Sequence, residues 1–243
     1  MITRRMRRLV GAPVGIAIGA VLGLLSTSNA FVGLEARTLD ARFKVRGERP
    51  LDPRIVVVDV NDETLSLLGW PVPRGFYAQL IDTAVKHGAR AVGFDVLFLE
   101  PSTAPMDALL VKAARDCKCA VFPSQLSPLP NGTYRVEPPL PELVAASASQ
   151  AHVQLDNGLD GVFRSAPPSL STSADDGHVF PALAVALARV AGAPVHLAGA
   201  LDPPGSEALR AGERRAWINW RAASSSAVHA LPLLDVLAAQ QAI

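Results

Sequence analysis

The residues most able to do chemistry are carboxylates at the ends of two apolar segments. The segments are IVVVDV (55–60) and ARAVGFDVLF (89–98), and both have the composition of strands buried on two faces. In a parallel sheet their carboxyl ends meet at one edge, where open α/β folds place a ligand crevice. We therefore predict an acidic rim that either binds a small ligand or an ion or has a structural role. Its residues are Asp59, Asp62, Asp95 and Glu100.

A rigid loop, GWPVPRG (69–75), lies on the same predicted edge, between the first strand and the helix that follows it. Its two prolines restrict the backbone, while Trp70 offers a flat apolar face and Arg74 a positive charge. Two interpretations stay open. In the first, Arg74 neutralises Asp59 or Asp95 and Trp70 covers the end of the sheet, so the whole set is structural. In the second, Trp70 roofs a pocket for the ligand.

The same carboxylates would suit a periplasmic metal-dependent hydrolase in which Asp59 and Asp95 hold a divalent cation. DVNDET (59–64) is similar to the aspartate signature of haloacid dehalogenases, but Asn61 stands where that scheme needs its proton donor. The sequence has neither a nucleophile elbow nor a glycine-rich phosphate loop. We therefore expect no catalytic residue, no metal site and no cofactor. The histidines, none at metal-ligand spacing, are His87, His152, His178, His196 and His229.

Periodic segments predict the elements that would carry this rim. FYAQLIDTAVKHG (76–88) has apolar residues at helical spacing and a closing glycine, so it predicts a helix between the two strands. A strand–helix–strand unit of this length gives a parallel pair. Later we expect helices at 107–115, 180–191 and 231–240, strands at 119–123 and 214–220, and a hairpin whose strands, 151–156 and 161–170, flank NGLDG.

Together these elements describe an α/β fold with a mixed, largely parallel sheet, flanking helices and an antiparallel hairpin. The net charge of +1 gives no reason to expect nucleic acid as a partner. Cys117 and Cys119 are the only cysteines. Two positions apart in a strand, they are poorly placed for a disulfide, and we expect two free thiols.

The N-terminus has the pattern of one transmembrane helix. Residues 9–34 carry no formal charge and, as a helix, exceed the thickness of the hydrocarbon core. Basic residues before them place residues 1–8 in the cytoplasm and the remainder outside. The alternative is a signal peptide cleaved after Ala30, although its apolar core exceeds the usual length. The basic residues are Arg4, Arg5, Arg7 and Arg8.

Glycine recurs at every fourth position of this segment. Small residues at that spacing form a stripe that lets two membrane helices approach closely, so we expect a homodimer. The alternative is that glycine is simply frequent in membrane helices. Mixed charged and apolar residues follow and predict a juxtamembrane helix at 35–50. The stripe consists of Gly11, Gly15, Gly19 and Gly23.

The block from Ile55 to Ser102 resembles the core of the CHASE type 2 domain, an extracytoplasmic sensor module of bacterial signalling receptors. The shared features are the strand ending in Asp59, the Leu-Gly-Trp-Pro-x-Pro-Arg loop (68–74) and a second strand ending in Gly-Phe-Asp (93–95). A weaker likeness covers roughly residues 37–240 and includes the family's Asp-Gly-x-x-Arg hairpin. In this chain the hairpin residues are Asp160, Gly161 and Arg164.

One departure from the family is Val72, where the loop often has a second tryptophan. The resemblance implies a sensor domain at 51–243 that receives an unknown small-molecule or protein stimulus at the membrane. It also implies a further strand, membrane helices and a cyclase or kinase output domain beyond residue 243. We therefore expect the sensor domain to be C-terminally incomplete and to have no catalysis of its own.

Overall fold

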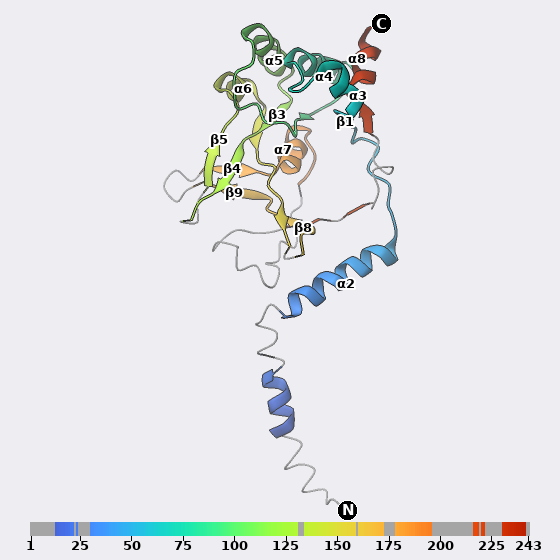
Figure 1. The fold of residues 1–243 in the computed structure, drawn as a ribbon, viewed down its shortest axis with the longest axis vertical. Coiled ribbons are helices and arrows are strands. Elements are labelled where there is room, and N and C mark those ends of the chain that lie inside the picture. The colour runs from blue at the N-terminus through green and yellow to red at the C-terminus, as the bar shows by residue number, and fades with distance from the viewer. Residues whose placement is uncertain are drawn as a thin grey trace, which may run out of the picture. The chain divides into compact units, whose positions relative to one another are not determined.

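The computed structural model shows a mixed α/β architecture with parallel sheets, antiparallel hairpins and flanking helices (Figure 1). Its elements fall into two units, one of residues up to Glu48 and one of residues from Arg49 onward. The strands all belong to the second unit. The structure describes residues 13–21, 23, 30–130, 134–158, 160–172, 178–195, 216–218, 220–221 and 230–241.

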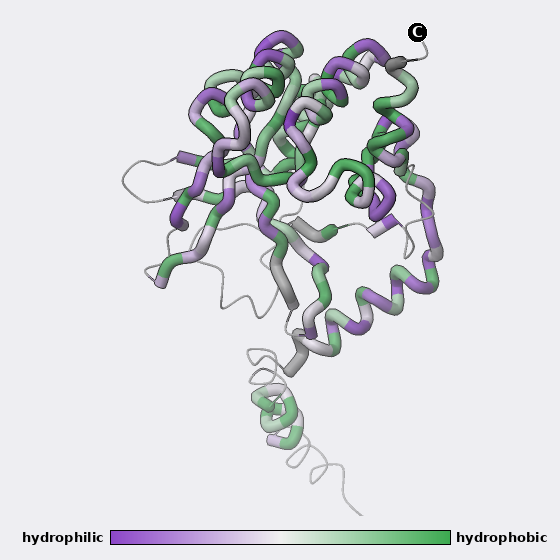
Figure 2. The backbone as a smooth tube through the Cα atoms, turned by 45° about the horizontal axis from the view of Figure 1, so that its top comes forward, coloured by the Kyte–Doolittle hydropathy of each residue, from purple (hydrophilic) through white to green (hydrophobic). Residues whose placement is uncertain are grey.

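The first unit is helical where it is described. Residues 13–21 form a helix, and α2 (Ala30–Arg46) covers most of the segment expected to be helical at 35–50. Purple and green alternate along α2 in Figure 2, because charged and apolar residues are interspersed on it. Leu34 and Val45 are accordingly exposed.

The transmembrane helix expected at 9–34 is not confirmed. Within the described ranges, which cover only part of that segment, no helix is both long and apolar enough to cross a membrane. Gly11 lies outside the described residues. At Gly15, Gly19 and Gly23 an added Cβ would meet no atom within 4 Å, so this stripe is open.

The second unit is organised around a parallel sheet in the order β2-β3-β6. Its strands are β2 (Val92–Gly93), β3 (Ala120–Pro123) and β6 (Ser149–Ala151). The crossover from β2 to β3 runs through α5 (Ala104–Cys117), and α6 (Pro141–Ala146) leads into β6, as parallel strands require. The central strand β3 is buried along its whole length. The strand predicted at 119–123 is thereby confirmed.

A second parallel pair consists of β1 (Val57–Asp59) and β12 (Ala230–Pro232). We predicted that the segments 55–60 and 89–98 would pair with each other, and this is wrong. Each is parallel to another strand, β1 to β12 and β2 to β3. Because β12 lies far along the chain, no local pattern identifies it as the partner of β1.

The expectation that β1 is buried on both faces is also wrong. Ile55, Val56 and Val57 keep 53%, 54% and 41% of their surface exposed. Val58 and Val60 pack against the core. Over the ranges described, β1 pairs on one side only, in a two-stranded sheet. Its β-branched composition therefore reflects a strand with one covered face.

Helices cover both faces of the β2-β3-β6 sheet. Alternate residues of a strand point to opposite faces, and accordingly Phe122 joins the core with α4, α5, α6 and α8 while Val121 packs against α7. Figure 1 shows α4 and α5 side by side at one end of this unit. The helices are α3 (Asp62–Leu68), α4 (Arg74–Lys86), α7 (Leu183–Val190) and α8 (Leu233–Gln241).

Four aromatic rings form the centre of the larger core. Phe94 and Phe122 are stacked, with ring centroids 4.9 Å apart. Phe98 meets both of these rings edge-on, and Tyr77 meets Phe94 and Phe98 edge-on. Such edge-to-face and stacked pairs add to the stabilisation from buried area. The cluster joins α4 to β3 and to the segment after β2. It therefore determines where the chain emerges at the carboxyl end of β2.

The antiparallel strand pairs follow β3 in the chain, and one of them, β9–β10, contacts β6 through β10. The predicted hairpin is present, because β7 pairs antiparallel with β8. Its first strand was predicted at 151–156, but only Asp156 of that range belongs to β7, and Ala151 is the end of β6. The segment 161–170 is divided between β8 and β9, and β9 pairs with β10. The remaining strands are β4 (Gln125–Pro128), β5 (Tyr134–Glu137), β7 (Asp156–Asn157), β8 (Phe163–Ala166), β9 (Ser169–Ser171), β10 (Val179–Pro181) and β11 (Ala216–Trp217).

Two neighbouring leucines on α5 provide a test of this core. Leu110 is fully buried, whereas Leu109 is 48% exposed. We expect Leu110→Ala to lower the free energy of unfolding by about 3–5 kcal/mol, because the cavity adds to the lost burial. Leu109→Ala should lower it by less than about 1 kcal/mol. Urea unfolding of the full chain, followed by circular dichroism, measures both, and equal losses would contradict the packing of α5.

Candidate functional site

The carboxyl end of β1 leads into a helix that the sequence analysis did not predict. The Asn61 side chain caps α3, accepting hydrogen bonds from the backbone N–H of Thr64 at 2.9 Å and from its hydroxyl at 2.7 Å. Asp62 and Glu63 follow in the first turn, where the positive end of the helix favours acidic residues. Asn61 therefore has a structural role at the position where the dehalogenase scheme needs an acid.

The loop 69–75 alternates between exposed and buried residues. Trp70 is 69% exposed and Val72 only 3%. We predicted that Trp70 would cover the end of the sheet or roof a pocket beneath it, and its exposure contradicts the first of these. Val72 fills the core instead, next to a cis Trp70–Pro71 peptide bond. The departure from the family at position 72 thus falls on a buried residue.

Arg74, the first residue of α4, is buried. One guanidinium nitrogen (Nη1) donates to the Asp107 carboxylate and the other (Nη2) to the backbone carbonyl of Glu100. The guanidinium also lies 5.5 Å from the centre of the Phe98 ring. We call this set the Arg74 clamp. It joins the start of α4 to the start of α5 and to the segment after β2.

The predicted partner of Arg74 is corrected by this geometry. We expected Asp59 or Asp95, but the carboxylate that binds Arg74 belongs to Asp107, in the first turn of α5. The second Asp107 oxygen accepts a hydrogen bond from the backbone N–H of Ser102 at 3.0 Å. The side chains of Arg74 and Asp107 are only 11% and 16% exposed, so this is a largely buried ion pair.

A glycine makes this approach of two helices possible. A Cβ at Gly75 would come within 2.9 Å of the Met106 sulfur and 3.6 Å of Leu109. Those two residues lie on α5, on either side of Asp107. A larger residue at this position would require the Met106 side chain to move. Gly75 therefore allows α4 to lie close to α5 beside the clamp.

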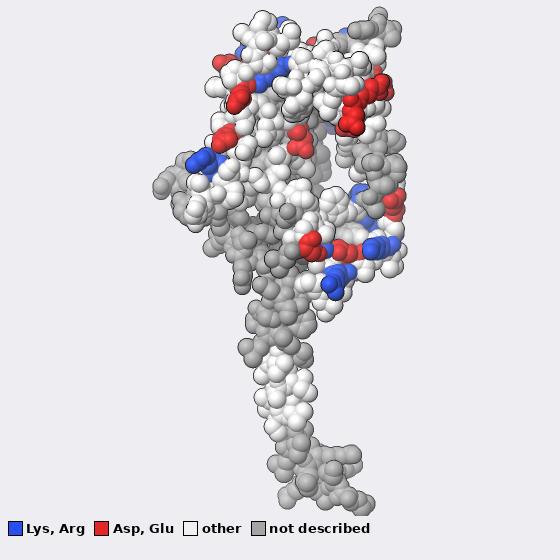
Figure 3. Space-filling view, in the orientation of Figure 1, with Lys and Arg blue, Asp and Glu red and all other residues white. Residues whose placement is uncertain are grey.

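The acidic rim itself is open. Asp59, Asp62, Asp95 and Glu100 are all exposed. In the part of the chain that the structure describes, none of their side chains forms an ion pair, and no group of three histidine, cysteine or acidic residues could hold a metal ion. Glu100 contributes to the clamp through its carbonyl rather than its carboxylate. In Figure 3 the acidic side chains of the visible face lie in several small groups.

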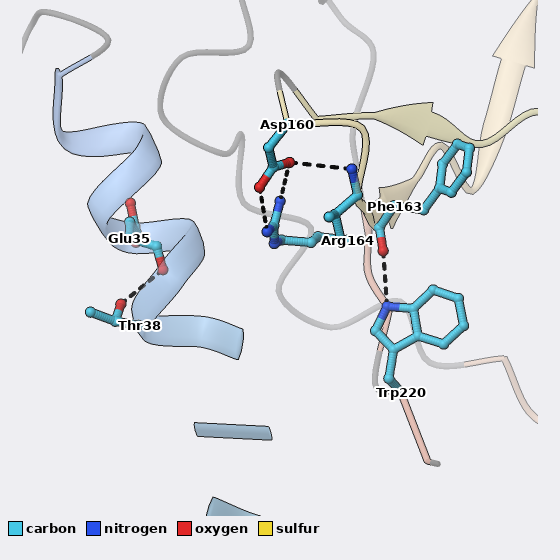
Figure 4. Close-up of polar contacts among 7 residues, drawn as sticks. Glu35, Thr38, Asp160, Phe163, Arg164 and Trp220 are labelled. Carbon is cyan, nitrogen blue, oxygen red and sulfur yellow. Dashed lines mark hydrogen bonds and ion pairs between the residues drawn. The ribbon is translucent and has the colours of Figure 1, made fainter. Parts of the chain in front are cut away.

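The Asp-Gly-x-x-Arg hairpin forms a second, local ion pair. The two carboxylate oxygens of Asp160 accept hydrogen bonds from the two terminal nitrogens of Arg164 at 2.8 and 2.7 Å (Figure 4). Asp160 also accepts from the backbone N–H of Val162 at 3.2 Å. The hydrogen bonds from Arg164 hold the pKa of Asp160 well below its usual range. Gly161 permits the turn, because its φ is +77°.

This hairpin is also linked to the late strand. Arg164 is buried, and its carbonyl accepts a hydrogen bond from the backbone N–H of Ile218 at 2.9 Å. The Trp220 indole N–H donates to the carbonyl of Phe163 at 3.0 Å (Figure 4). β11 pairs antiparallel with β8 beside these contacts. The strand predicted at 214–220 and the hairpin thus form one sheet.

The two cysteines are free, and they do not lie together in one strand, because Cys117 ends α5 and Cys119 directly precedes β3. The backbone N–H of Cys119 points to the Cys117 sulfur at 3.0 Å. Burial and the neighbouring thiol raise the pKa of Cys119 to about 12, so this thiol stays protonated at neutral pH.

One comparison with known proteins gives a match. A family model described as the CHASE2 domain matches residues 16–243, nearly the whole chain. No curated protein and no solved structure matches. The match includes the Trp70 loop, the Arg74 clamp and the Asp160–Arg164 hairpin.

The Arg74 clamp is testable by a double-mutant cycle. Arg74→Ala leaves the Asp107 carboxylate buried without its cation, so we expect the free energy of unfolding to fall by about 2–4 kcal/mol. Asp107→Asn in the same background should restore part of the loss, giving a coupling of at least about 1 kcal/mol. Urea unfolding of the full chain at neutral pH measures all four proteins.

Two further pairs of residues serve as controls for this cycle, and we expect no coupling in either. The exposed Lys112–Asp116 pair lies on the same helix α5 and should show no measurable coupling. Arg74→Ala and Asp95→Asn should have additive effects. A coupling between Arg74 and Asp95 in place of Asp107 would contradict the observed pairing.

Trp70 and Val72 give a matched pair within one loop. Because Trp70 is exposed, Trp70→Ala should change the free energy of unfolding by less than about 0.5 kcal/mol. Val72→Ala should lower it by about 2 kcal/mol, since two methyl groups leave the core. Circular dichroism during urea unfolding follows both. A larger loss for Trp70→Ala than for Val72→Ala would mean that Trp70 packs against the fold.

Proposed function

Because the chain belongs to the CHASE2 family of extracytoplasmic sensory domains, we propose that it is the stimulus-receiving part of a membrane-bound bacterial signal-transduction receptor. The observation that carries this proposal is the family match over residues 16–243. The chain itself performs no catalysis in this proposal. Its signal passes to a cyclase or kinase output domain in the same receptor.

The proposed topology follows the charge pattern at the N-terminus. Residues 1–8 are cytoplasmic, residues 9–34 span the inner membrane, and residues 35–50 form a juxtamembrane helix. The sensor domain, residues 51–243, then lies in the periplasm. The extracytoplasmic character of the family supports this arrangement.

We further propose that the receptor works as a homodimer. The glycine stripe of the predicted span supports this, because small residues every fourth position allow two membrane helices to pack closely. The sides of Gly15, Gly19 and Gly23 are open within one chain, which leaves room for a second helix. Pairing there would hold two sensor domains close to one another.

The stimulus is proposed to act at the exposed end of α3 and the Trp70 loop. Trp70 and Leu67 are 69% and 68% exposed, and Asp62 and Glu63 begin the same short helix. A large aromatic side chain that folding leaves exposed is well suited to bind a partner or ligand. The buried residues Val72 and Arg74 hold the loop from which it projects. The stimulus is thus a small molecule or a protein that contacts this surface.

Reporter fusions test the proposed topology. We expect alkaline phosphatase fused after Pro50 to be active, because that enzyme folds in the periplasm, and green fluorescent protein at the same site to remain dark. Deleting residues 9–34 should reverse both results. A fusion after Pro50 that is active only in the cytoplasm would refute the sensor's location. The mass of the mature chain separates the anchor from a cleaved signal peptide, whose product would begin at Phe31.

A further inference from the structure

His152 lies at a junction of three parts of the second unit. It directly follows β6, and its backbone N–H donates to the carbonyl of Pro181, at the end of β10, at 2.9 Å. Its own carbonyl accepts from the N–H of Leu183, the first residue of α7, at 2.9 Å. An isolated parallel bridge joins His152 to Ala182. The residue therefore holds the parallel sheet, the β9–β10 hairpin and α7 together.

The His152 ring is enclosed and has a defined tautomer. Its exposed fraction is 1%. The backbone N–H of Gln154 donates to Nδ1 at 3.2 Å, so Nδ1 is an acceptor and the proton of the neutral ring is on Nε2. Nε2 is buried and has no hydrogen-bond partner among the described residues. The Gln154 side chain reaches the carbonyl of Leu126 on β4, which ties a fourth element to the same turn.

Within the described ranges, the elements packed around His152 carry no acidic side chain. Among the described residues, β3, β4, β6, β9 and β10 contain no titratable or charged side chain. The charged or titratable groups found on these elements and their flanks in the described ranges include the exposed Arg189 on α7 and the exposed His178 before β10. They also include the buried Cys119 thiol before β3 and Arg90, which donates to the carbonyl of Ala191 after α7. The positive end of α7 also disfavours a cation at its first residue. Burial lowers the pKa of His152 to about 4.

We propose that His152 is a proton-operated latch, in which binding of one proton to its ring at acidic pH separates β6 from β10 and from the start of α7. The proton comes from solvent and binds Nδ1. Nδ1–H and the N–H of Gln154 then face each other as two donors, so their hydrogen bond is lost. The imidazolium reaches water only when the junction opens.

The direction and size of the effect follow from linkage. The pKa of His152 is lower in the closed state than in an open state with an ordinary value of about 6.5, so the closed state is fully stable above pH 6.5. It loses stability as the pH falls from 6.5 toward 4. The ratio of open to closed junction should rise about tenfold at pH 5.5 and about 150-fold at pH 4, relative to pH 7.5.

Backbone hydrogen exchange of the full chain, followed by mass spectrometry, measures this opening. We expect the protection of peptides covering 149–154 and 179–186 to fall about tenfold between pH 7.5 and pH 5.5, after correction for intrinsic exchange rates. Peptides from α5 around Leu110 should show no such change. His152→Asn keeps an acceptor oxygen for Gln154 but does not titrate, so its junction should not respond to pH.

His178→Asn is the matched control, because it removes an exposed histidine next to β10 and should leave the response intact. The pKa of His152 in the wild-type chain is measured directly by exchange of the ring C2 hydrogen, independently of whether His152→Asn folds. A value below about 5 supports the latch, and an ordinary value near 6.5 overturns it. An equal loss of protection in wild type and His152→Asn overturns it as well.

Discussion

A guanidinium buried at the start of α4 sets the arrangement of the segments around it. A charge removed from water is costly unless it is paired and fully hydrogen-bonded. Arg74 meets this requirement with the Asp107 carboxylate, the Glu100 carbonyl and the face of Phe98. These partners come from α5, from the segment after β2 and from the aromatic core. The position of each is therefore constrained by the same charge.

This constraint determines what the Trp70 loop presents to solvent. Val72 and Arg74 both point into the protein, and Trp70, two residues earlier, is directed outward. Stability is supplied by the two buried residues, which leaves Trp70 without a packing role in the unit. The division of roles within one loop connects the folding of α4 and α5 to the proposed stimulus surface. Asp62 and Glu63 add negative charge at the start of α3, the helix that precedes this loop.

Local patterns predicted the local elements. The helical spacing and closing glycine of 76–88 correspond to α4, and the short apolar run at 119–123 corresponds to β3. The sequence did not predict α3, because its seven residues contain little periodicity and its start depends on the Asn61 cap. Pairing that depends on distant residues was not predictable. β12 lies far from β1, and Asp107 lies 33 residues from Arg74, so neither partnership leaves a signal in the neighbouring sequence.

Two of the arginine–aspartate pairs in the described part of the second unit, Arg164–Asp160 and Arg74–Asp107, differ in how far apart in the sequence their residues lie. Arg164 and Asp160 are four residues apart, and their pair shapes a single turn that the motif itself specifies. Arg74 and Asp107 join two helices, and Gly75 and the Phe98 ring lie beside their pair. The His152 junction also depends on residues that are distant in the sequence, since β6, β10 and α7 meet there. His152 directly follows Ala151, which belongs with Val121 and Ala186 to a separate, smaller set of buried residues. A proton there would loosen the contacts of α7 while the core around the clamp stays closed, so the fold can open on one face of its sheet alone.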